Sequence, residues 1–147
     1  MNITITKATE KDFPDILEMI KELAEYEKAP EKVTNNLQKM QKEKHLFQAF
    51  IAREYDRPVG FALFFFAYFT WTGKSLYLDD IYVRQEYRKQ GIGKKLITVV
   101  INFAKQNNCS RIRWQVLNWN TPAIEFYKKL GATISDEWLN CEIDLNR

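Results

Sequence analysis

A turn rich in glycine and in cationic side chains is the stretch whose residue types most clearly indicate chemistry. Residues 87–96 read YRKQGIGKKL, where Gly91 and Gly93 are flanked by Arg88, Lys89, Lys94 and Lys95. The turn lies between a strand-like and a helix-like segment, and its glycines let the backbone approach a ligand closely. Unpaired N–H groups and the positive dipole end at the start of the following helix favour an anion. The sequence therefore predicts a phosphate or pyrophosphate site here.

Two common phosphate-binding motifs do not fit this turn. A P-loop requires a glycine where Arg88 stands, and serine or threonine where Lys95 follows Lys94. The dinucleotide fingerprint requires a third glycine at position 96, which is Leu96. Taken alone, the remaining Arg-x-x-Gly-x-Gly pattern is short, and a flexible loop with a solvated basic face is an alternative.

Length and composition indicate one globular domain. The chain has 147 residues, of which 46% are hydrophobic and 14% aromatic, so we expect a single domain over residues 1–147. The formal net charge is only +3, with acidic and basic residues interspersed. Nucleic-acid-binding domains usually carry a larger and more clustered excess of positive charge. We therefore expect no nucleic-acid partner and an anion affinity confined to the turn.

The cysteines and the apolar runs favour a reduced, cytoplasmic protein. Cys109 and Cys141 are too few for a disulfide framework or a zinc site, so we expect free thiols and no bound metal. The first residues, MNITITKATEKDF, contain no signal-peptide core. The most apolar run, Phe61 to Trp71, is shorter than the roughly 20 residues of a membrane helix. We therefore expect no membrane association.

Hydrophobic periodicity predicts a mixed α/β (α+β) fold. Strands are expected over residues 2–7, 46–54, 61–69, 75–83 and 111–117, with one or two more in the tail after residue 131. Helices are expected from Thr9 to about Glu27, from a Thr34 cap to about Lys42, from Ile92 to about Lys105, and from Asn120 to Gly131. Because hairpins are combined with a strand–helix–strand crossover, we expect a mixed, mostly antiparallel sheet flanked by helices.

The turn and its neighbours resemble a known family. LYLDDIYV, then QEYRKQGIGKKLI, then a further strand and WNTPAIEFYKKLGA are together similar to the GNAT (Gcn5-related N-acetyltransferase) superfamily. That family carries Arg/Gln-x-x-Gly-x-Gly/Ala between a strand and a helix. DILEMIKELAEYEKAPEKV and TWTGKSLYLDDIYV resemble the branch containing diamine (spermidine/spermine) and thialysine acetyltransferases. The likeness lies along nearly the whole chain and is strongest over residues 75–131.

The resemblance implies the GNAT acyl-CoA N-acyltransferase fold and direct attack of an amine on the thioester of acetyl-CoA, the co-substrate. It implies that N–H groups around Gln90 to Lys94 hold the pyrophosphate, and that the strand end at Ile81 to Val83 pairs with the pantetheine arm. The implied cofactor-binding residues are Ile81, Tyr82, Val83, Arg88, Lys89, Gln90, Gly91, Ile92, Gly93, Lys94, Asn120 and Tyr127.

Proton transfer requires a base, because an alkyl ammonium has a pKa near roughly 10.4 and cannot attack while protonated. The only histidine, His45, lies far from these motifs. Asp79 matches a position where the family usually has Glu. Because the side chain of Asp is shorter than that of Glu, the resemblance implies that Asp79 acts as a base through an intervening water. Asp79 and Asp80 are adjacent, so in a regular strand only one faces the site, unless a β-bulge re-aims the pair. A structural alternative is an Asp that caps a nearby loop.

The leaving thiolate requires a proton, and the resemblance implies Tyr127 as its donor. A free tyrosine has a pKa of roughly 10, so the phenol is protonated at neutral pH. Alternatively, Tyr127 packs in the core with Ala123 and Leu130, from which it is separated by helical spacing. Asn120 would contact the cofactor arm, cap the last helix, or do both.

The acceptor is implied less specifically. Tyr26 and Glu27 match residues near the acceptor in the diamine branch, and Trp119 would form a wall beside them. The implied substrate-binding residues are Tyr26, Glu27, Asp79, Asp80 and Trp119. The polyamine enzymes have Asp-Pro before the tryptophan of this hairpin, where Phe69 and Thr70 stand here. The loss of that anchoring charge favours a lysine analogue or a short diamine over a long polyamine.

Three other expectations follow from the sequence and the resemblance. A protein or peptide amine acetyltransferase would share the cofactor half and differ in the acceptor cleft. A non-catalytic acyl-CoA-binding sensor would need neither Asp79 nor Tyr127. The family is commonly dimeric, and apolar strands near the C-terminus favour a homodimer.

Overall fold

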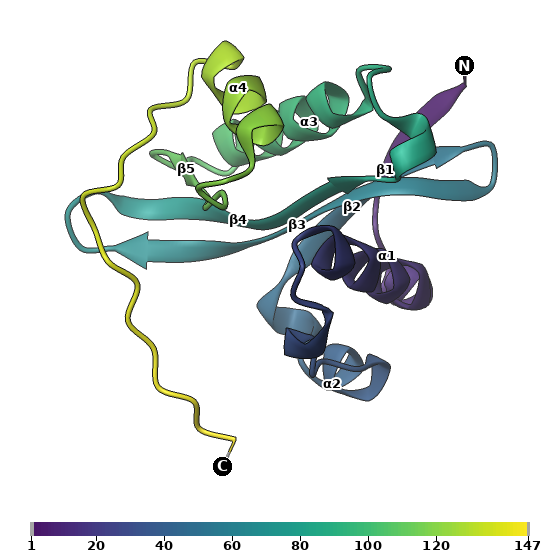
Figure 1. Ribbon diagram of the computed structural model, residues 1–147, viewed down its shortest axis with the longest axis horizontal. Coiled ribbons are helices and arrows are strands. Elements are labelled where there is room, and N and C mark those ends of the chain that lie inside the picture. The colour runs from purple at the N-terminus through teal and green to yellow at the C-terminus, as the bar shows by residue number, and fades with distance from the viewer. Residues whose placement is uncertain (1, 147) are drawn as a thin grey trace. The chain divides into compact units, whose positions relative to one another are not determined.

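The computed structural model describes residues 2–146 (Figure 1), and the chain divides into two compact units between Gln115 and Val116. The strands are β1 (Ile3–Lys7), β2 (Gln48–Glu54), β3 (Arg57–Phe69), β4 (Gly73–Val83) and β5 (Ile112–Arg113). The helices are α1 (Phe13–Tyr26), α2 (Leu37–Lys42), α3 (Ile92–Gln106) and α4 (Thr121–Lys129), with 3-10 turns at Glu10–Asp12, Pro30–Lys32, Lys44–Leu46 and Gln85–Tyr87.

The first unit is built on one sheet in the order β1-β2-β3-β4-β5. Neighbours from β1 to β4 pair antiparallel, and β5 runs parallel to β4 after the crossover through α3. The predicted mixed, mostly antiparallel sheet flanked by helices is confirmed. The glycine turn lies between β4 and α3, as the sequence predicted.

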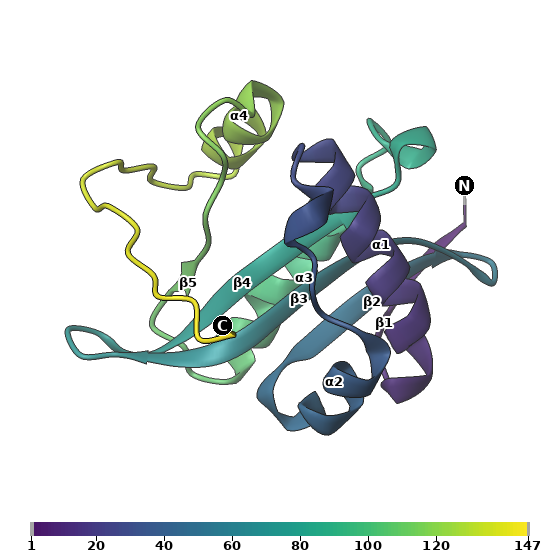
Figure 2. The same ribbon diagram turned by 60° about the horizontal axis from the view of Figure 1, so that its bottom comes forward.

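Helices of the first unit cover both faces of this sheet: α1 and α2 lie on one face and α3 on the other (Figures 1 and 2). On the α1 face, the fully buried Ile16 and Met19 pack with Phe61 of β3. On the opposite face, the Phe103 ring of α3 lies 5.3 Å from the Phe64 ring. Burial of these apolar side chains holds the ends of β4 and α1 in place.

Strand alternation decides which side chains of β4 share a face with α1. Leu78 pairs with Phe64, which contacts α3, so Leu78 belongs to the α3 face. Tyr77 pairs with Phe65, and their rings stack 5.3 Å apart on the other face. Tyr77 therefore lies on the same face of the sheet as α1.

The start of the second helix corrects the prediction. Asn36, not Thr34, caps α2: its side-chain oxygen accepts a hydrogen bond from the Lys39 N–H at 2.9 Å. Asparagine is a stronger N-cap than threonine, so the helix begins only at Leu37. The predicted strand from residue 46 likewise begins later, at Gln48, because residues 44–46 form a 3-10 turn.

The second unit contains α4 and the tail. Asn120 caps α4, as predicted, and accepts a hydrogen bond from the Ala123 N–H at 3.4 Å, while Gly131 follows the helix at φ +90°. The predicted tail strands are wrong, because residues 132–146 form no helix or strand. Leu139, Ile143 and other apolar tail residues alternate as in a strand but are exposed. A strand forms only when its backbone groups find a neighbour, and the tail pairs with none in the described chain.

The predicted strand over residues 111–117 is also too long, since only Ile112 and Arg113 pair with β4. Within residues 2–146, no helix has the length and apolar character needed to cross a bilayer. The organisation of residues 1–147 as a single domain stays a prediction.

Candidate active site

A β-bulge in β4 determines where the two adjacent aspartates point. Leu63 of β3 pairs with Asp80 and Phe64 pairs with Leu78, so Asp79 has no residue opposite it. An extra residue of this kind interrupts the strict alternation of side chains along a strand. The β-bulge that would allow Asp79 and Asp80 to serve one site is therefore present.

The bulge places Asp79 and Asp80 within electrostatic reach of Glu27, which follows the last residue of α1. The pKa of Asp80 is raised to about 7, first by burial and then by the charges of Asp79 and Glu27. Burial, followed by the charge of Asp79, raises the pKa of Glu27. Burial alone raises the pKa of Asp79, the most exposed of the three. The structure thus brings together three residues that the sequence predicted for the acceptor site.

Three carboxylates that resist ionisation together form a site that attracts a cation, because a bound positive charge relieves their mutual repulsion. Within residues 2–146, no three His, Cys, Asp or Glu side chains are arranged to hold a metal ion. An organic ammonium would relieve this repulsion in the carboxylate cluster of Glu27, Asp79 and Asp80. Asp80, with a pKa of about 7, is also the carboxylate best suited to exchange a proton at neutral pH.

The outer edge of β4 beside this cluster has no neighbouring strand. Only Leu76 and Tyr77 pair with β5, and from Leu78 to Val83 no strand of residues 2–146 lies against that edge. An extended ligand with amide groups can add to such an edge like a further strand. Ile81, Tyr82 and Val83, the residues predicted to pair with a pantetheine arm, lie on it.

Two backbone conformations shape the glycine turn. Lys89 has φ +63° and Gly91, the N-cap of α3, has φ +81°. The helix bond from the Lys95 N–H to the Gly91 carbonyl measures 3.1 Å. The N–H groups of Ile92, Gly93 and Lys94 precede that bond and lie at the positive end of the helix dipole, an arrangement that suits a phosphate.

Exposed side chains at the turn, those of Lys89, Gln90 and Lys94, leave it open to a ligand. Arg88, predicted to assist the anion, is directed elsewhere. Its Nε donates to the Val83 carbonyl at 2.9 Å, and its guanidinium lies 4.8 Å from the centre of the Tyr26 ring and 5.6 Å from that of Tyr82. Arg88 therefore connects the turn to the end of α1, where Tyr26 and Glu27 lie.

A second connection between α1 and β4 was missed by sequence reasoning. Arg84 makes two hydrogen bonds to the Glu22 carboxylate, at 3.0 and 3.2 Å, and the Tyr82 hydroxyl donates to the same carboxylate at 3.0 Å. Burial, followed by this bond to Glu22, raises the pKa of Tyr82 to about 12. The Tyr82 side chain is thus committed to α1, which leaves only its backbone for a ligand. Glu18, one helical turn before Glu22, also pairs with Arg84 at 3.5 Å, and the (i, i+4) spacing of the two glutamates was the available signal.

Three predicted residues, Trp119, Asn120 and Tyr127, belong to the second unit and are described within it. Asn120 is 9% exposed and caps α4, so its predicted capping role is confirmed. Tyr127 is 8% exposed, and its ring lies 5.6 Å from that of Phe126. Trp119 is 43% exposed.

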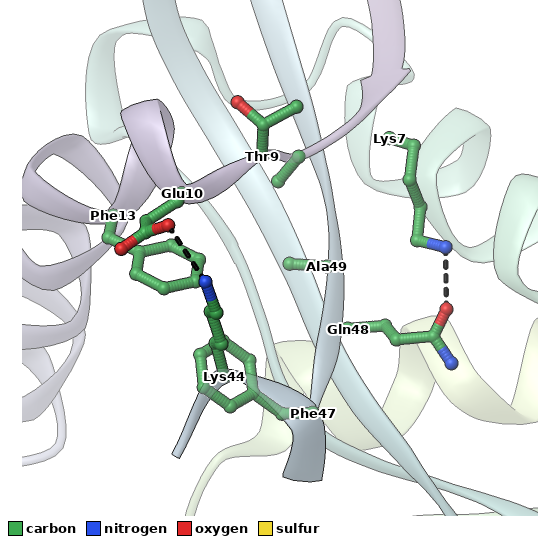
Figure 3. Close-up of a pocket in the computed structure, with 9 residues that line it drawn as sticks. Lys7, Thr9, Glu10, Phe13, Lys44, Phe47, Gln48 and Ala49 are labelled. Atoms are coloured by element: carbon green, nitrogen blue, oxygen red, sulfur yellow. Dashed lines mark hydrogen bonds and ion pairs between the residues drawn. The ribbon is translucent and has the colours of Figure 1, made fainter. Parts of the chain in front are cut away.

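A separate hollow lies near the start of α1 and contains none of the predicted site residues (Figure 3). Its lining residues are Lys7, Ala8, Thr9, Glu10, Phe13, Lys44, Phe47, Gln48 and Ala49. Two of its cations are already bound: Lys44 pairs with Glu10 at 3.2 Å, and Lys7 donates to Gln48.

Comparison with known proteins establishes the family. Residues 11–132 match the Acetyltransferase (GNAT) family. A thialysine N-epsilon-acetyltransferase of Sus scrofa is 41% identical over 143 residues, which cover 89% of this chain and 84% of that protein. A protein of the same name from Caenorhabditis elegans is 34% identical over 97% of this chain and 92% of its own length.

A solved structure supports the fold. The crystal structure of an aminoglycoside acetyltransferase from a soil metagenomic sample superposes with a TM-score of 0.82, covering 98% of this chain and 97% of its own, at 21% identity. The chain belongs to the GNAT acetyltransferase family. It is an acetyltransferase, and its co-substrate is acetyl-CoA.

Gly91→Ala should weaken acetyl-CoA binding by straining the turn. A Cβ at Gly91 would meet no atom within 4 Å, so the cost comes from φ +81° alone, about 1–2 kcal/mol. We expect a lower melting temperature and a KM for acetyl-CoA raised about 10-fold. Gly131→Ala is the matched control, because Gly131 has φ +90° and equally open space. It should cost similar stability and leave that KM unchanged; an equal rise in KM for both variants would contradict the assignment of the turn.

Proposed function

We propose that this chain transfers the acetyl group of acetyl-CoA to a primary amine of a small diamine, polyamine or lysine analogue such as thialysine. The observation that carries this proposal is the cluster of Glu27, Asp79 and Asp80, which lies beside the unpaired edge of β4. Attack of an amine on a thioester requires a site for the ammonium next to a site for the acyl carrier. The carboxylate cluster suits the first, and the unpaired strand edge suits the second.

The proposed cofactor site uses backbone groups more than side chains. The N–H groups from Gln90 to Lys94 would bind the pyrophosphate, with Lys89 and Lys94 adding positive charge at the surface. The backbone of Ile81 to Val83 would pair with the pantetheine amides. Arg88 would act indirectly, since its contacts with Val83 and Tyr26 hold the turn against the end of α1.

The proposed base is the pair of Asp79 and Asp80. Asp79 would hold the ammonium and a relaying water, and Asp80 would be the final proton acceptor, because its pKa of about 7 lies near the operating pH. The neutral amine nitrogen then attacks the thioester carbonyl carbon and a C–N bond forms. The tetrahedral intermediate collapses with cleavage of the C–S bond.

Tyr127 is the proposed acid for the leaving thiolate, and the Tyr127 hydroxyl would supply its proton. The second proton that the nitrogen loses on becoming an amide would replace the one that Tyr127 gives up. Asp80 would release its proton to solvent, so that both groups return to their starting states. Asn120 would support the cofactor arm while it caps α4.

The proposed acceptor-binding residues of the first unit are Tyr26 and Glu27 in addition to the two aspartates, and Trp119 of the second unit is proposed for the same role. An aromatic ring beside a carboxylate suits an alkyl ammonium, which gains both a cation–π contact and an ion pair. We further propose a homodimer. We also propose a cytoplasmic location, where the two free cysteines of the described chain would stay reduced. Gel filtration with light scattering would test the dimer.

Spermine should be a poorer substrate than thialysine. Phe69 and Thr70 offer no carboxylate for a distal ammonium, so a long polyamine gains one ion pair fewer and we expect its kcat/KM to be about 10-fold lower. Steady-state kinetics with both amines at saturating acetyl-CoA measure the ratio. A spermine value well above that of thialysine would contradict the assignment of the acceptor class. Turnover of a peptide amine alone would favour a protein acceptor.

A further inference from the structure

The second half of α1 leads directly to Glu27 but contributes less to the apolar core than the first half does. The buried residues of α1, which are Phe13, Ile16 and Met19, all lie in its first half. Residues 20–26 are half-buried or exposed. Because apolar burial is non-directional, it resists sliding or tilting of a helix only weakly where few side chains are buried. The position of Glu27 therefore depends on the other contacts of this half of the helix.

Polar contacts at every fourth residue connect this half of α1 to the end of β4. Glu18, Glu22 and Tyr26 lie on one face of the helix, because residues four apart are neighbours on its surface. Arg84 pairs with Glu18 at 3.5 Å and with Glu22 at 3.0 Å. One turn further on, the Arg88 guanidinium lies 4.8 Å from the centre of the Tyr26 ring. We call this row of three residues the polar seam of α1.

Glu22 is the middle residue of the polar seam and makes its most directional contacts. Its carboxylate accepts hydrogen bonds from Arg84 Nε at 3.2 Å, from Arg84 Nη2 at 3.0 Å and from the Tyr82 hydroxyl at 3.0 Å. Arg84 also donates from Nη1 to the Pro58 carbonyl at 2.9 Å, so the same guanidinium is fixed to β3. Because a hydrogen bond weakens steeply when its donor and acceptor move out of line, these bonds fix the axial position of α1.

The helical backbone connects Glu22 to the carboxylate cluster. Five residues separate Glu22 from Glu27, a rise of about 7.5 Å, and the Glu27 N–H still bonds to the Leu23 carbonyl at 2.9 Å. A displacement of α1 at Glu22 would therefore be passed on to Glu27. The charges of Asp79 and Glu27 both raise the pKa of Asp80, so this pKa depends on how near Glu27 lies.

We infer that Glu22 is a positioning residue of the acceptor site: its bonds to the end of β4 hold Glu27 beside the two aspartates. Three carboxylates repel one another, and the hydrogen bonds of Glu22 offset that repulsion by fixing the helix that leads to Glu27. Glu22 thus acts through Glu27 and takes no part in proton transfer. The inference rests on the proposed function only in taking the carboxylate cluster as the site of the amine.

The test is the pKa of the Asp80 side chain, followed by NMR of its carboxyl carbon and assigned with Asp80→Asn. In Glu22→Ala the end of α1 can move away, so we expect this pKa to fall by roughly 0.5 or more, because a like charge farther away repels less. The kcat/KM for the amine should fall about 10-fold, since Glu27 is no longer held in place. Tyr82→Phe removes one hydrogen bond and no charge, so it should lower the pKa by less and serves if Glu22→Ala does not fold.

Glu18→Ala controls for the loss of charge. It removes the same charge from the same face of α1, one helical turn earlier, and leaves the hydrogen bonds of Glu22 in place. The Glu18 side chain is 65% exposed, and an ion pair with such an exposed partner contributes little. Glu18→Ala should therefore leave the pKa of Asp80 unchanged.

Arg53→Ala controls for the loss of stability. It breaks the ion pair between β2 and Asp12, which lies immediately before α1. Asp12 is 14% exposed, and Arg84, which Glu22→Ala deprives of its partner, is 13% exposed. Because each variant leaves a largely buried charge without its ion-pair partner, the two should lower the melting temperature by similar amounts. Only Glu22→Ala should change the pKa under test.

Glu27→Gln completes the test, because it removes the charge through which Glu22 is inferred to act. On that background, Glu22→Ala should change the pKa of Asp80 no further. The inference is wrong if Glu22→Ala leaves this pKa unchanged, if Arg53→Ala lowers it equally, or if Glu22→Ala still lowers it in the Glu27→Gln protein. If the pKa follows the expected pattern but the unaltered protein acetylates no amine, the proposed function fails and the positioning of Glu27 stands.

Discussion

Asp80→Asn should lower kcat/KM for the amine by about 10²- to 10³-fold, the range expected for loss of a general base. The fall in kcat/KM toward acidic pH, the acidic limb of the pH–rate profile, should also disappear in this variant. In the unaltered protein that limb should lie near pH 7, because activity requires the ionised form of a carboxylate whose pKa is about 7. The measurement is kcat/KM from pH 5.5 to 9 at saturating acetyl-CoA.

Asp79→Asn separates the two aspartates. The charge of Asp79 raises the pKa of Asp80, so its removal should move the acidic limb to lower pH and raise the KM for the amine. If Asp79→Asn abolishes the limb and Asp80→Asn leaves it in place, the two residues have the opposite roles.

Stability provides a control for Asp80→Asn that does not depend on turnover. A carboxyl whose pKa is higher in the folded than in the unfolded chain destabilises the fold as pH rises from about 4 to about 7. The variant lacks this cost, so its melting temperature should exceed that of the unaltered protein above pH 7, and the difference should shrink toward pH 4. A variant that is less stable at pH 8 would show that its lost activity reflects damage to the fold.

Tyr127→Phe should lower kcat by about 10- to 100-fold and leave acetyl-CoA affinity roughly intact. The thiolate would then leave without a proton donor, while the ring that packs beside Phe126 keeps its shape. Stopped-time assays give kcat, and calorimetric titration with CoA gives the affinity. Phe126→Leu, at the neighbouring ring, is the control and should alter stability more than kcat. Unchanged turnover in Tyr127→Phe would remove this hydroxyl from the mechanism.

The strands and helices of the first unit could be predicted because their apolar side chains recur at the period of the element they form. Phe13 and Ile16 of α1 and Phe61, Ala62 and Phe64 of β3 are buried, as their spacing requires. The tail could not be predicted in the same way. Leu139 and Ile143 alternate like a strand, but pairing depends on a partner edge that no local pattern specifies.

Within the site, the sequence predicted the residues better than their arrangement. Glu27, Asp79 and Asp80 were each expected near the acceptor, but the bulge that brings the aspartates together depends on the register with β3. Arg88 was assigned to the anion from the motif, whereas its contact with the Tyr26 ring is a tertiary one.

The most direct experiment is release of free thiol from acetyl-CoA, followed with thialysine, lysine, ornithine, short diamines, spermidine, spermine and a peptide amine in parallel. We expect selective turnover of thialysine, its analogues or a short diamine over the long polyamines and the peptide amine, with the acetyl group found on the primary amine by mass spectrometry. If acetyl-CoA binds but no small amine increases thiol release, the carboxylate cluster of Glu27, Asp79 and Asp80 is not an acceptor site for small amines. The acceptor would then be a protein, or the chain would sense acyl-CoA without turning it over.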